Sequence, residues 1–286
     1  MLDSIFRYEF LQNSFLTGMI IGVIAPLLGV FIVIRKQALI ADALSHVTLA
    51  GISGGILLQS FLPSFAGFNP LYGGLIFSIG GALLIEKLRS FYKHYEELAI
   101  PIIMSLGMGL AVVMISLTSG TNVDRFVGYL FGSISAVSRE DLYVVIGISL
   151  FVLVLIFLIF KELFALSFDE DYGKAQGLPV KYIHFAFILT VALTIAISMR
   201  IVGILLVSSL ITLPVAASIR IAKSFKQSVI FSVIFGEISV IGGLIIAFYL
   251  DLAPGGTIVI LASFILLFTI LINKFQRKRS VFTKKG

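Results

Sequence analysis

Long apolar runs alternate with short polar segments from one end of the sequence to the other. Each run is close to the roughly 20 residues that a helix needs to cross the hydrocarbon core of a bilayer. The pattern therefore predicts an all-α, polytopic membrane protein with a single transmembrane domain over residues 1–286. The predicted spans are 11–34, 38–61, 70–86, 98–118, 142–160, 183–198, 201–220, 228–250 and 256–273.

We count nine spans, and eight is the alternative. The runs at 70–86 and 183–198 are shorter than the others, so either could be a re-entrant or broken helix. Pro26 and Pro214 lie inside apolar runs and are expected to kink or interrupt their helices. Membrane proteins tolerate such breaks where the freed backbone groups face protein or a wet cavity.

The composition excludes other broad classes of protein. Hydrophobic residues make up 59% of the chain, charged residues only 13%, and the mean hydropathy is +1.11. A soluble domain has about 25% charged residues, so the low charged fraction excludes a soluble globule. The high hydrophobic fraction excludes a disordered chain. The sequence contains no cysteine, which rules out disulfides and thiolate metal ligands.

The basic residues are divided unevenly between the two sides of the predicted membrane. If the segment 161–182 is cytoplasmic and the spans alternate, 17 of the 21 Lys and Arg residues fall in cytoplasmic segments, six of them in the tail 274–286. The positive-inside rule then predicts a cytoplasmic C-terminus and, with nine spans, an N-terminus on the opposite side. The net charge of +6 accordingly reflects topology and contact with membrane lipids, not nucleic-acid binding.

Asp42 and His46 are ionisable residues inside the second predicted span. A charged side chain costs at least about 2.5 kcal/mol at the centre of a bilayer, so each calls for an explanation. Four residues apart, the two side chains share one helix face, about 6 Å from each other along the axis. Two interpretations fit. In the first, the carboxylate and the imidazole bind a divalent cation such as zinc or manganese, or carry protons. In the second, they form a local structural pair.

Three further polar residues stand near or within spans. Glu237 is well inside its span, and either lines the same passage or pairs with a polar group on a neighbouring helix. His184, at the edge of its span, is expected to be interfacial rather than a ligand, and Asp251 is expected to cap a turn on the outer side.

The longest polar interruption is the segment 161–182. Acidic residues at 169–171 and Gly-Leu-Pro at 177–179 are start and stop signals for a short helix, which is either a plain connector or a docking site for a soluble partner. The sequence has no P-loop and no other nucleotide-binding motif. We therefore expect the chain to hydrolyse no ATP, so that energy for transport comes from another subunit or from an ion gradient.

Three segments together resemble the membrane permeases of bacterial metal-ion ATP-binding-cassette importers, the ABC-3 family. They are RKQALIADALSHVTLAG at 35–51, DEDYGKAQGLPVK at 169–181, and RIVGILLVSSLITLPVAASIRIA at 200–222 followed by YLDLAPGGTIVIL at 249–261. The likeness runs in order over essentially the whole chain.

This resemblance implies a vitamin-B12-importer-like fold, a homodimer with the translocation path along its axis, and a place in the bacterial cytoplasmic membrane. Two copies of a separate ATPase would dock on a coupling helix at about 168–179, with Asp169, Glu170 and Gly177 as coupling residues. An extracytoplasmic metal-binding protein would deliver the ion. Asp42 and His46 would contact it in the path, with Glu237 as a further candidate.

No permanently bound cofactor is expected. The resemblance also indicates which metal ion is the cargo. Leu-Ala-Gly at 49–51 is similar to the zinc branch of the family, whereas manganese relatives more often read Leu-Pro-Gly there. Zinc is therefore the first expectation and manganese the alternative. Two other classes remain open: a secondary transporter in which Asp42, His46 and Glu237 relay protons, and a membrane scaffold without a transport path.

Overall fold

The computed structural model describes residues 8–65, 67–92, 95–118 and 122–282, and within these ranges every regular element is helical, which confirms the all-α class. The long helices are α2 (Glu9–Ile34), α3 (Ala38–Phe61), α4 (Pro70–Phe91), α5 (Ala99–Ser116), α7 (Arg139–Phe168), α9 (Val180–Val202), α10 (Ile204–Ile221), α11 (Phe225–Leu250) and α12 (Pro254–Phe282). The short elements are α6 (Asn122–Phe131), α8 (Glu170–Ala175) and the 3-10 turns η1 (Pro63–Phe65), η2 (Glu96–Leu98) and η3 (Ile134–Ala136).

All nine predicted spans coincide with helices. Among the described residues, eight helices are long and apolar enough to cross a membrane. The ninth, α10, is an apolar helix of 18 residues that continues through Pro214, as α2 continues through Pro26. The two short runs belong to α4 and α9, which are continuous over 22 and 23 residues, so neither is broken or re-entrant.

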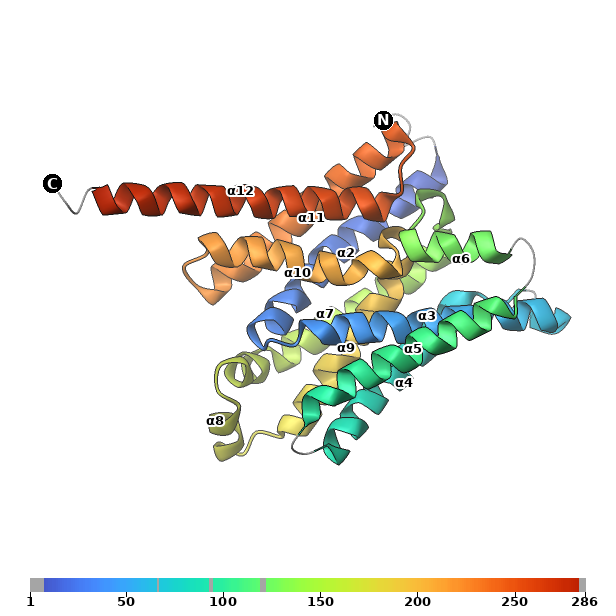
Figure 1. Cartoon of the computed structure of the whole chain (residues 1–286), viewed down its shortest axis with the longest axis horizontal. Helices are drawn as coiled ribbons and strands as arrows, with labels where there is room; N and C mark the ends of the chain where they lie inside the picture. Colours follow the sequence, from blue (N-terminus) through green and yellow to red (C-terminus); the bar gives the residue numbers. More distant parts are fainter. Residues whose placement is uncertain (1–7, 66, 93–94, 119–121, 283–286) are drawn as a thin grey trace.

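Successive long helices run in opposite directions, so their connections gather at two ends of the bundle (Figure 1). One end carries α8 and the turn between α2 and α3, where Arg35 contacts His184 at the start of α9. The other end carries α6 and η3, and there Asn69, before α4, contacts Arg200 near the end of α9. We call them the α8 end and the α6 end. The described parts of the predicted cytoplasmic segments lie at the α8 end.

The helices α3 and α9 form the centre of the bundle, and most of their side chains are buried. The helix α3 packs against α4, α5, α9 and α10, whereas α11 packs against α2, α10 and α12. The outer helices α5, α7 and α12 keep long apolar faces exposed, for example at Phe157 of α7, which is 83% exposed. Such a surface is that of a protein embedded in lipid.

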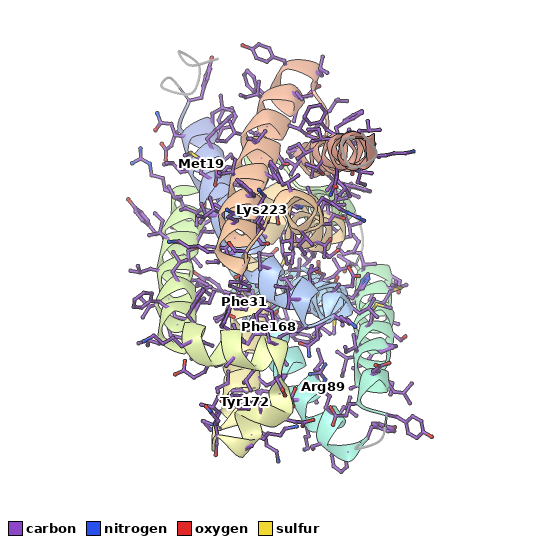
Figure 2. The ribbon with its side chains drawn as sticks, turned by 90° about the vertical axis from the view of Figure 1, so that its left-hand side faces the viewer. Met19, Phe31, Arg89, Phe168, Tyr172 and Lys223 are labelled. Atoms are coloured by element: carbon purple, nitrogen blue, oxygen red, sulfur yellow. The ribbon has the colours of Figure 1, made fainter. Side chains whose placement is uncertain are left out.

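Aromatic rings hold the helices together at the α8 end. The ring of Phe225, at the start of α11, lies 4.8–6.3 Å, centroid to centroid, from four others. These come from α2 and α7: Phe31, Phe160, Phe164 and Phe168. Figure 2, which looks onto this end, shows Phe31 and Phe168 near its middle, above Tyr172 of α8. Because tilted and edge-to-face ring contacts are favourable, the ends of α2, α7 and α11 form one block beside α8.

Two glycines make a tight junction at the α6 end. Gly203 separates α9 from α10 with a φ of 79° and a ψ of 147°, a conformation that is essentially restricted to glycine. A side-chain carbon on Gly203 would also overlap the carbonyl of Leu130, and one on Gly255 would overlap the carbonyl of Val202. The end of α6, the joint between α9 and α10 and the first turn of α12 therefore meet backbone to backbone.

Gly107 of α5 lies directly against α3 at the level of His46. A Cβ on Gly107 would lie 2.7 Å from the backbone nitrogen of Val47, whereas a Cβ on Gly109 would meet nothing within 4 Å. We expect Gly107→Ala to cost about 1–3 kcal/mol of unfolding free energy, because backbone cannot give way, and Gly109→Ala to be neutral or slightly stabilising. Denaturant unfolding of the purified protein in detergent checks this. Equal effects of the two substitutions would contradict the close contact.

Candidate functional site

Asp42 and His46 lie one turn apart on the same face of α3, and both are half-buried. Leu39, one turn before Asp42, is 58% exposed, so this face opens out of the chain near the α8 end. Toward the α6 end the same side of the helix closes, because Leu49 and Ser53 are buried. The predicted pair thus occupies the last open turns before the helix enters the packed centre.

The imidazole of His46 makes no hydrogen bond through Nδ1 within the described chain. Its Nδ1 atom is buried and has no hydrogen-bond partner, and no hydrogen bond within the described chain joins it to Asp42. The neighbouring hydroxyls are occupied: Ser45 Oγ donates to the carbonyl of Ala41 at 2.8 Å, and Thr48 donates to that of Leu44. A structural pair would have satisfied both side chains, so this arrangement favours the ligand interpretation.

Within the part of the chain that the structure describes, Asp42 and His46 have no third His, Asp or Glu beside them. In the ranges that the structure describes, no group of three or more His, Asp or Glu side chains lies close enough to hold a metal ion. A structural zinc site needs four ligands, so Asp42 and His46 alone do not form one. Two donors are chemically suited to hold a divalent ion loosely.

Glu237 lies in a different helix interface. Its carboxylate faces α2, since a Cβ on Gly22 would lie 2.8 Å from Glu237 Oε1. That oxygen is buried without a hydrogen-bond partner. Although α10 lies between them, α11 and α3 make no extensive contact with each other within the described residues, so the structure does not bring Glu237 together with Asp42 and His46.

The predicted short helix in 161–182 is present as α8. Asp169 caps its start by accepting a hydrogen bond from the backbone N–H of Tyr172 at 2.9 Å. Gly177, with a φ of 79°, ends it, and the N–H of Leu178 returns to the carbonyl of Gly173 at 3.1 Å. This is a Schellman motif, the ordinary glycine termination of a helix. Asp251 likewise ends α11, in the left-handed conformation, as the sequence predicts.

Glu170 of α8 has two partners. Its Oε1 pairs with Lys174 at 2.9 Å and its Oε2 lies 3.4 Å from His184 Nε2. Partial burial acts to raise the pKa of the Glu170 carboxyl, but the hydrogen bond from Lys174 and the nearby His184 outweigh it, so the pKa is lowered. The carboxylate is therefore ionised at neutral pH.

His184 lies deeper than the sequence suggests. It is only 8% exposed, in the first turn of α9, and Arg35 Nη2 lies 3.0 Å from its Nδ1. The sequence marks His184 only as an edge residue, because nothing in it pairs two positions 149 residues apart. The contact from Glu170 through His184 to Arg35 was not predicted.

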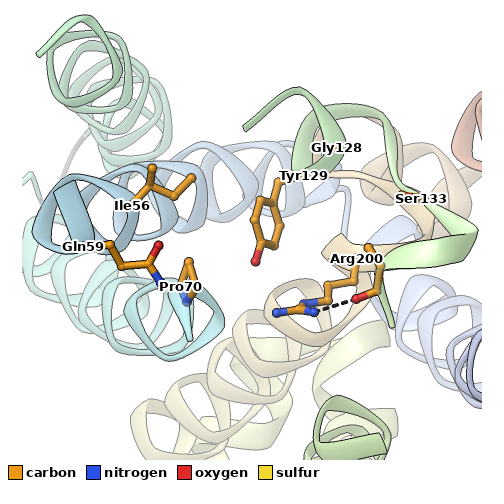
Figure 3. A pocket seen from close by; sticks show the side chains of 8 residues that line it. Ile56, Gln59, Pro70, Gly128, Tyr129, Ser133 and Arg200 are labelled. Carbon is orange, nitrogen blue, oxygen red and sulfur yellow. Dashed lines mark hydrogen bonds between the residues drawn. The ribbon is translucent and has the colours of Figure 1, made fainter. Parts of the chain in front are cut away.

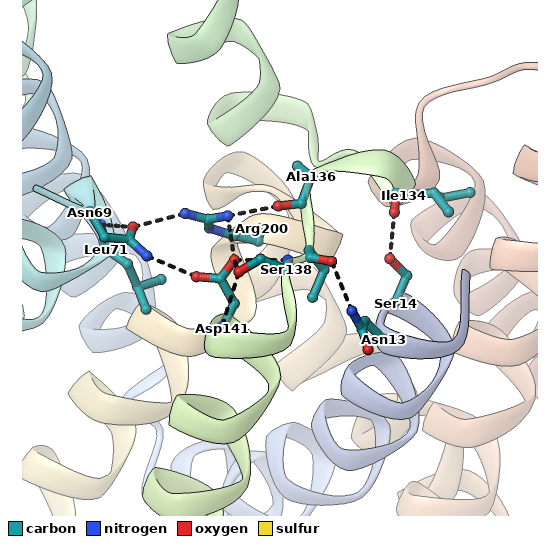
Figure 4. Close-up of polar contacts among 10 residues, drawn as sticks. Asn13, Ser14, Asn69, Leu71, Ile134, Ala136, Ser138, Asp141 and Arg200 are labelled. Carbon is teal, nitrogen blue, oxygen red and sulfur yellow. Dashed lines mark hydrogen bonds and ion pairs between the residues drawn. The ribbon is translucent and has the colours of Figure 1, made fainter. Parts of the chain in front are cut away.

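A second unpredicted cluster lies at the α6 end (Figure 4). Arg200 of α9 forms a salt bridge with Asp141 at the start of α7, and donates to Asn69 Oδ1 at 2.8 Å and to the carbonyl of Ala136 at 2.7 Å. Asp141, 2% exposed, also accepts from Asn69 Nδ2 at 2.9 Å and from Ser138 Oγ at 2.6 Å. The cluster ties together the starts of α4 and α7 and the end of α9.

A cavity of about 500 Å³ adjoins this cluster (Figure 3). The guanidinium of Arg200 lies 5.6 Å from the centroid of the Tyr129 ring, which α6 contributes. Ile56 and Gln59 of α3 line the opposite wall. The α6 helix thus covers one end of α3, the helix that carries Asp42 and His46.

Residues 7–273 match the family described as ABC 3 transport family. The chain belongs to this family. ABC 3 membership agrees with the three motifs recognised in the sequence.

Several relatives in the ABC 3 transport family are similar over nearly their full length. A "Probable metal transport system membrane protein" of Treponema pallidum is 33% identical, over 96% of this chain and 99% of the relative. The "Manganese transport system membrane protein MntC" of Halalkalibacterium halodurans is 32% identical, over 91% and 86%. The "High-affinity zinc uptake system membrane protein ZnuB" of Haemophilus influenzae is 32% identical, over 95% and 99%.

The fold is similar to that of PsaBC from Streptococcus pneumoniae, solved in complex with Fab. The TM-score is 0.79 with 29% identity, and the match covers 94% of this chain and 93% of that one. The expected ABC-importer permease fold is thereby confirmed.

Proposed function

We propose that the chain is the permease subunit of an ATP-driven importer of a divalent metal ion. The observation that carries the proposal is the pair Asp42 and His46, an acid and an imidazole with a free Nδ1 on one face of a membrane-embedded helix. Such oxygen and nitrogen donors suit zinc and manganese. The names of the relatives, which are metal transport proteins, support the same cargo class.

Zinc is the proposed cargo and manganese the alternative. The Leu-Ala-Gly sequence at 49–51 favours zinc through its resemblance to the zinc branch. Relatives of about equal identity carry manganese and zinc in their names, so either metal is consistent with them.

We propose that two copies of the chain form a homodimer with the path between them. The open face of α3 at Leu39, Asp42 and His46 supports this arrangement, because a lone chain would expose polar groups to lipid. Each copy would offer two donors, and the ion would be held weakly enough to move on. Alternating access would then open the path first to one side and then to the other.

The energy is proposed to come from a separate ATPase that docks on α8, with Asp169, Glu170 and Gly177 at the contact. The α8 end would face the cytoplasm of a bacterium, together with the C-terminus, as the distribution of basic residues predicts. A metal-binding protein would deliver the ion at the α6 end.

The test is metal uptake into proteoliposomes. We expect Zn²⁺ to accumulate only when the chain is reconstituted with its ATPase partner and supplied with ATP, and Mn²⁺ measured side by side assigns the metal. The chain alone is expected to hydrolyse no ATP. Uptake driven by a proton gradient without the ATPase would contradict the proposal and favour the secondary transporter.

A further inference from the structure

A continuous line of polar contacts joins α8 to the start of α3. Glu170 of α8 contacts His184 of α9 at 3.4 Å, and His184 contacts Arg35 at 3.0 Å. Arg35 is the C-cap of α2, and α3 begins three residues later at Ala38. We call Glu170, His184 and Arg35 the polar link.

The polar link is enclosed at His184, whereas the Glu170 side chain is 42% exposed. His184 is 8% exposed, and the guanidinium of Arg35 lies 5.7 Å from the centroid of the Phe187 ring. Phe187 in turn packs on Phe31 of the aromatic block, at 6.2 Å between ring centroids. Hydrogen bonds that involve charged groups are stronger when water is excluded, so the buried contact between His184 and Arg35 firmly joins two elements that are far apart in sequence.

The turn that follows Arg35 is equally stiff. Lys36 has a φ of 56°, the left-handed conformation that a residue with a side chain rarely adopts. Two backbone hydrogen bonds close the turn, from Lys36 N to the carbonyl of Val33 at 3.0 Å and from Gln37 N to that of Ile32 at 2.9 Å. Backbone in a disfavoured conformation persists only where the surroundings hold it. A displacement of Arg35 would therefore reach α3 instead of being absorbed in the turn.

Space for such a displacement exists beside the polar link. A polar cavity of about 700 Å³ separates α8 from the ends of α4 and η2. Four polar atoms of residues that line it are buried without a hydrogen-bond partner: Arg35 Nη1, Gln37 Oε1, Glu86 Oε2 and Arg89 Nε. On this side α8 is thus not fixed by apolar packing.

We propose that the polar link transmits the movement of α8 to α3, and through α3 to Asp42 and His46. The path runs from Glu170 to His184, from His184 to Arg35, and then along seven residues of turn and helix to Asp42. In this proposal His184 and Arg35 act as positioning residues. The inference rests on the proposed function, in which the ATPase docks on α8.

The first test compares transport with ATP hydrolysis in the reconstituted complex of this chain and its ATPase. His184→Phe keeps a ring of similar size without polar atoms, and Arg35→Gln removes the charge. We expect both to retain ATP hydrolysis within about twofold while Zn²⁺ or Mn²⁺ carried per ATP falls at least tenfold. The control is Lys181→Gln, which removes a charge from the same cavity wall outside the polar link and should leave the ratio unchanged. An unchanged ratio in both link variants would overturn the inference.

The second test reads α3 directly and does not depend on the cargo. Because the chain has no cysteine, Leu39→Cys introduces a single thiol on the exposed turn before Asp42. We expect its labelling rate by a water-soluble maleimide to change at least threefold on ATP binding, and expect Arg35→Gln to abolish that change. No ATP-dependent change in the parent Leu39→Cys chain, or an equal change in the link variant, would overturn the inference. Metal uptake by the parent complex, measured separately, would still decide the proposed function.

Discussion

Replacing Asp42 by Asn is expected to reduce metal uptake by the reconstituted complex at least tenfold. The substitution keeps the size of the side chain but removes the charge and the better oxygen donor. Because Asp42 and His46 are the two proposed donors of α3, an ion would lose one of these two contacts from each chain. His46→Gln is expected to act similarly, since losing even an outer contact of a metal site costs about 10–100-fold. The measurement is the initial rate of Zn²⁺ and Mn²⁺ entry at saturating ATP.

Ser45→Ala is the matched control for this prediction. Ser45 lies between the two donors in sequence, but its hydroxyl is already bonded to the carbonyl of Ala41. We expect it to retain uptake within twofold, and we expect the double variant of Asp42 and His46 to be no worse than the single ones. Near-normal uptake in that double variant would remove the pair from the path and leave a scaffold as the simpler description.

Replacing Arg200 by Met is expected to lower the free energy of unfolding by about 3–5 kcal/mol. The guanidinium is the charged partner of Asp141, whose side chain is 2% exposed. Removing one member of a buried ion pair leaves the other charge uncompensated, and this costs far more than the pair contributes. Asn69 and Ser138 would still donate to Asp141, but neither carries a charge. Denaturant unfolding in detergent measures the loss.

Arg139→Met provides the comparison for that measurement. Arg139 pairs with Glu9 at the same end of the bundle, but the two side chains are 63% and 55% exposed. Exposed ion pairs contribute about 0–1 kcal/mol, so the expected loss is small. A similar loss for Arg139→Met and Arg200→Met would mean that burial of the Asp141 carboxylate is not what makes the cluster at the α6 end important.

The positions of the helices were predictable because lipid imposes one requirement on every span. A segment in the hydrocarbon core must satisfy its own backbone, which leaves a helix of about 20 apolar residues as the solution. Hydropathy alone therefore located all nine runs, and Asp169 and Gly177 marked α8 because capping is a local property. The α6 helix was missed, since its ten residues are too few and too mixed to form a span.

The contacts between helices were not predictable in the same way. Asp42 and His46 could be paired from their spacing, because four residues on one helix fix a common face. The contact between Arg35 and His184 joins positions 149 residues apart, and that between Asn69 and Arg200 joins positions 131 residues apart. Both contacts depend on the packing of several helices. The sequence did not predict which helix Glu237 faces, and in the structure its carboxylate lies against α2. The sequence signalled these contacts only through the position of Arg35 and Arg200, charged residues at the ends of predicted spans.

The glycine junction at the α6 end also sets an order of events during biosynthesis. The carbonyls of Phe131 and Val202 meet Gly255, which is translated only after α7, α9, α10 and α11. A ribosome that has produced everything up to α11 has already supplied the joint between α9 and α10 on which α6 rests, but not yet the first turn of α12. A nascent chain stalled before α12 would therefore hold α6 against the joint between α9 and α10, with one side of the junction still open.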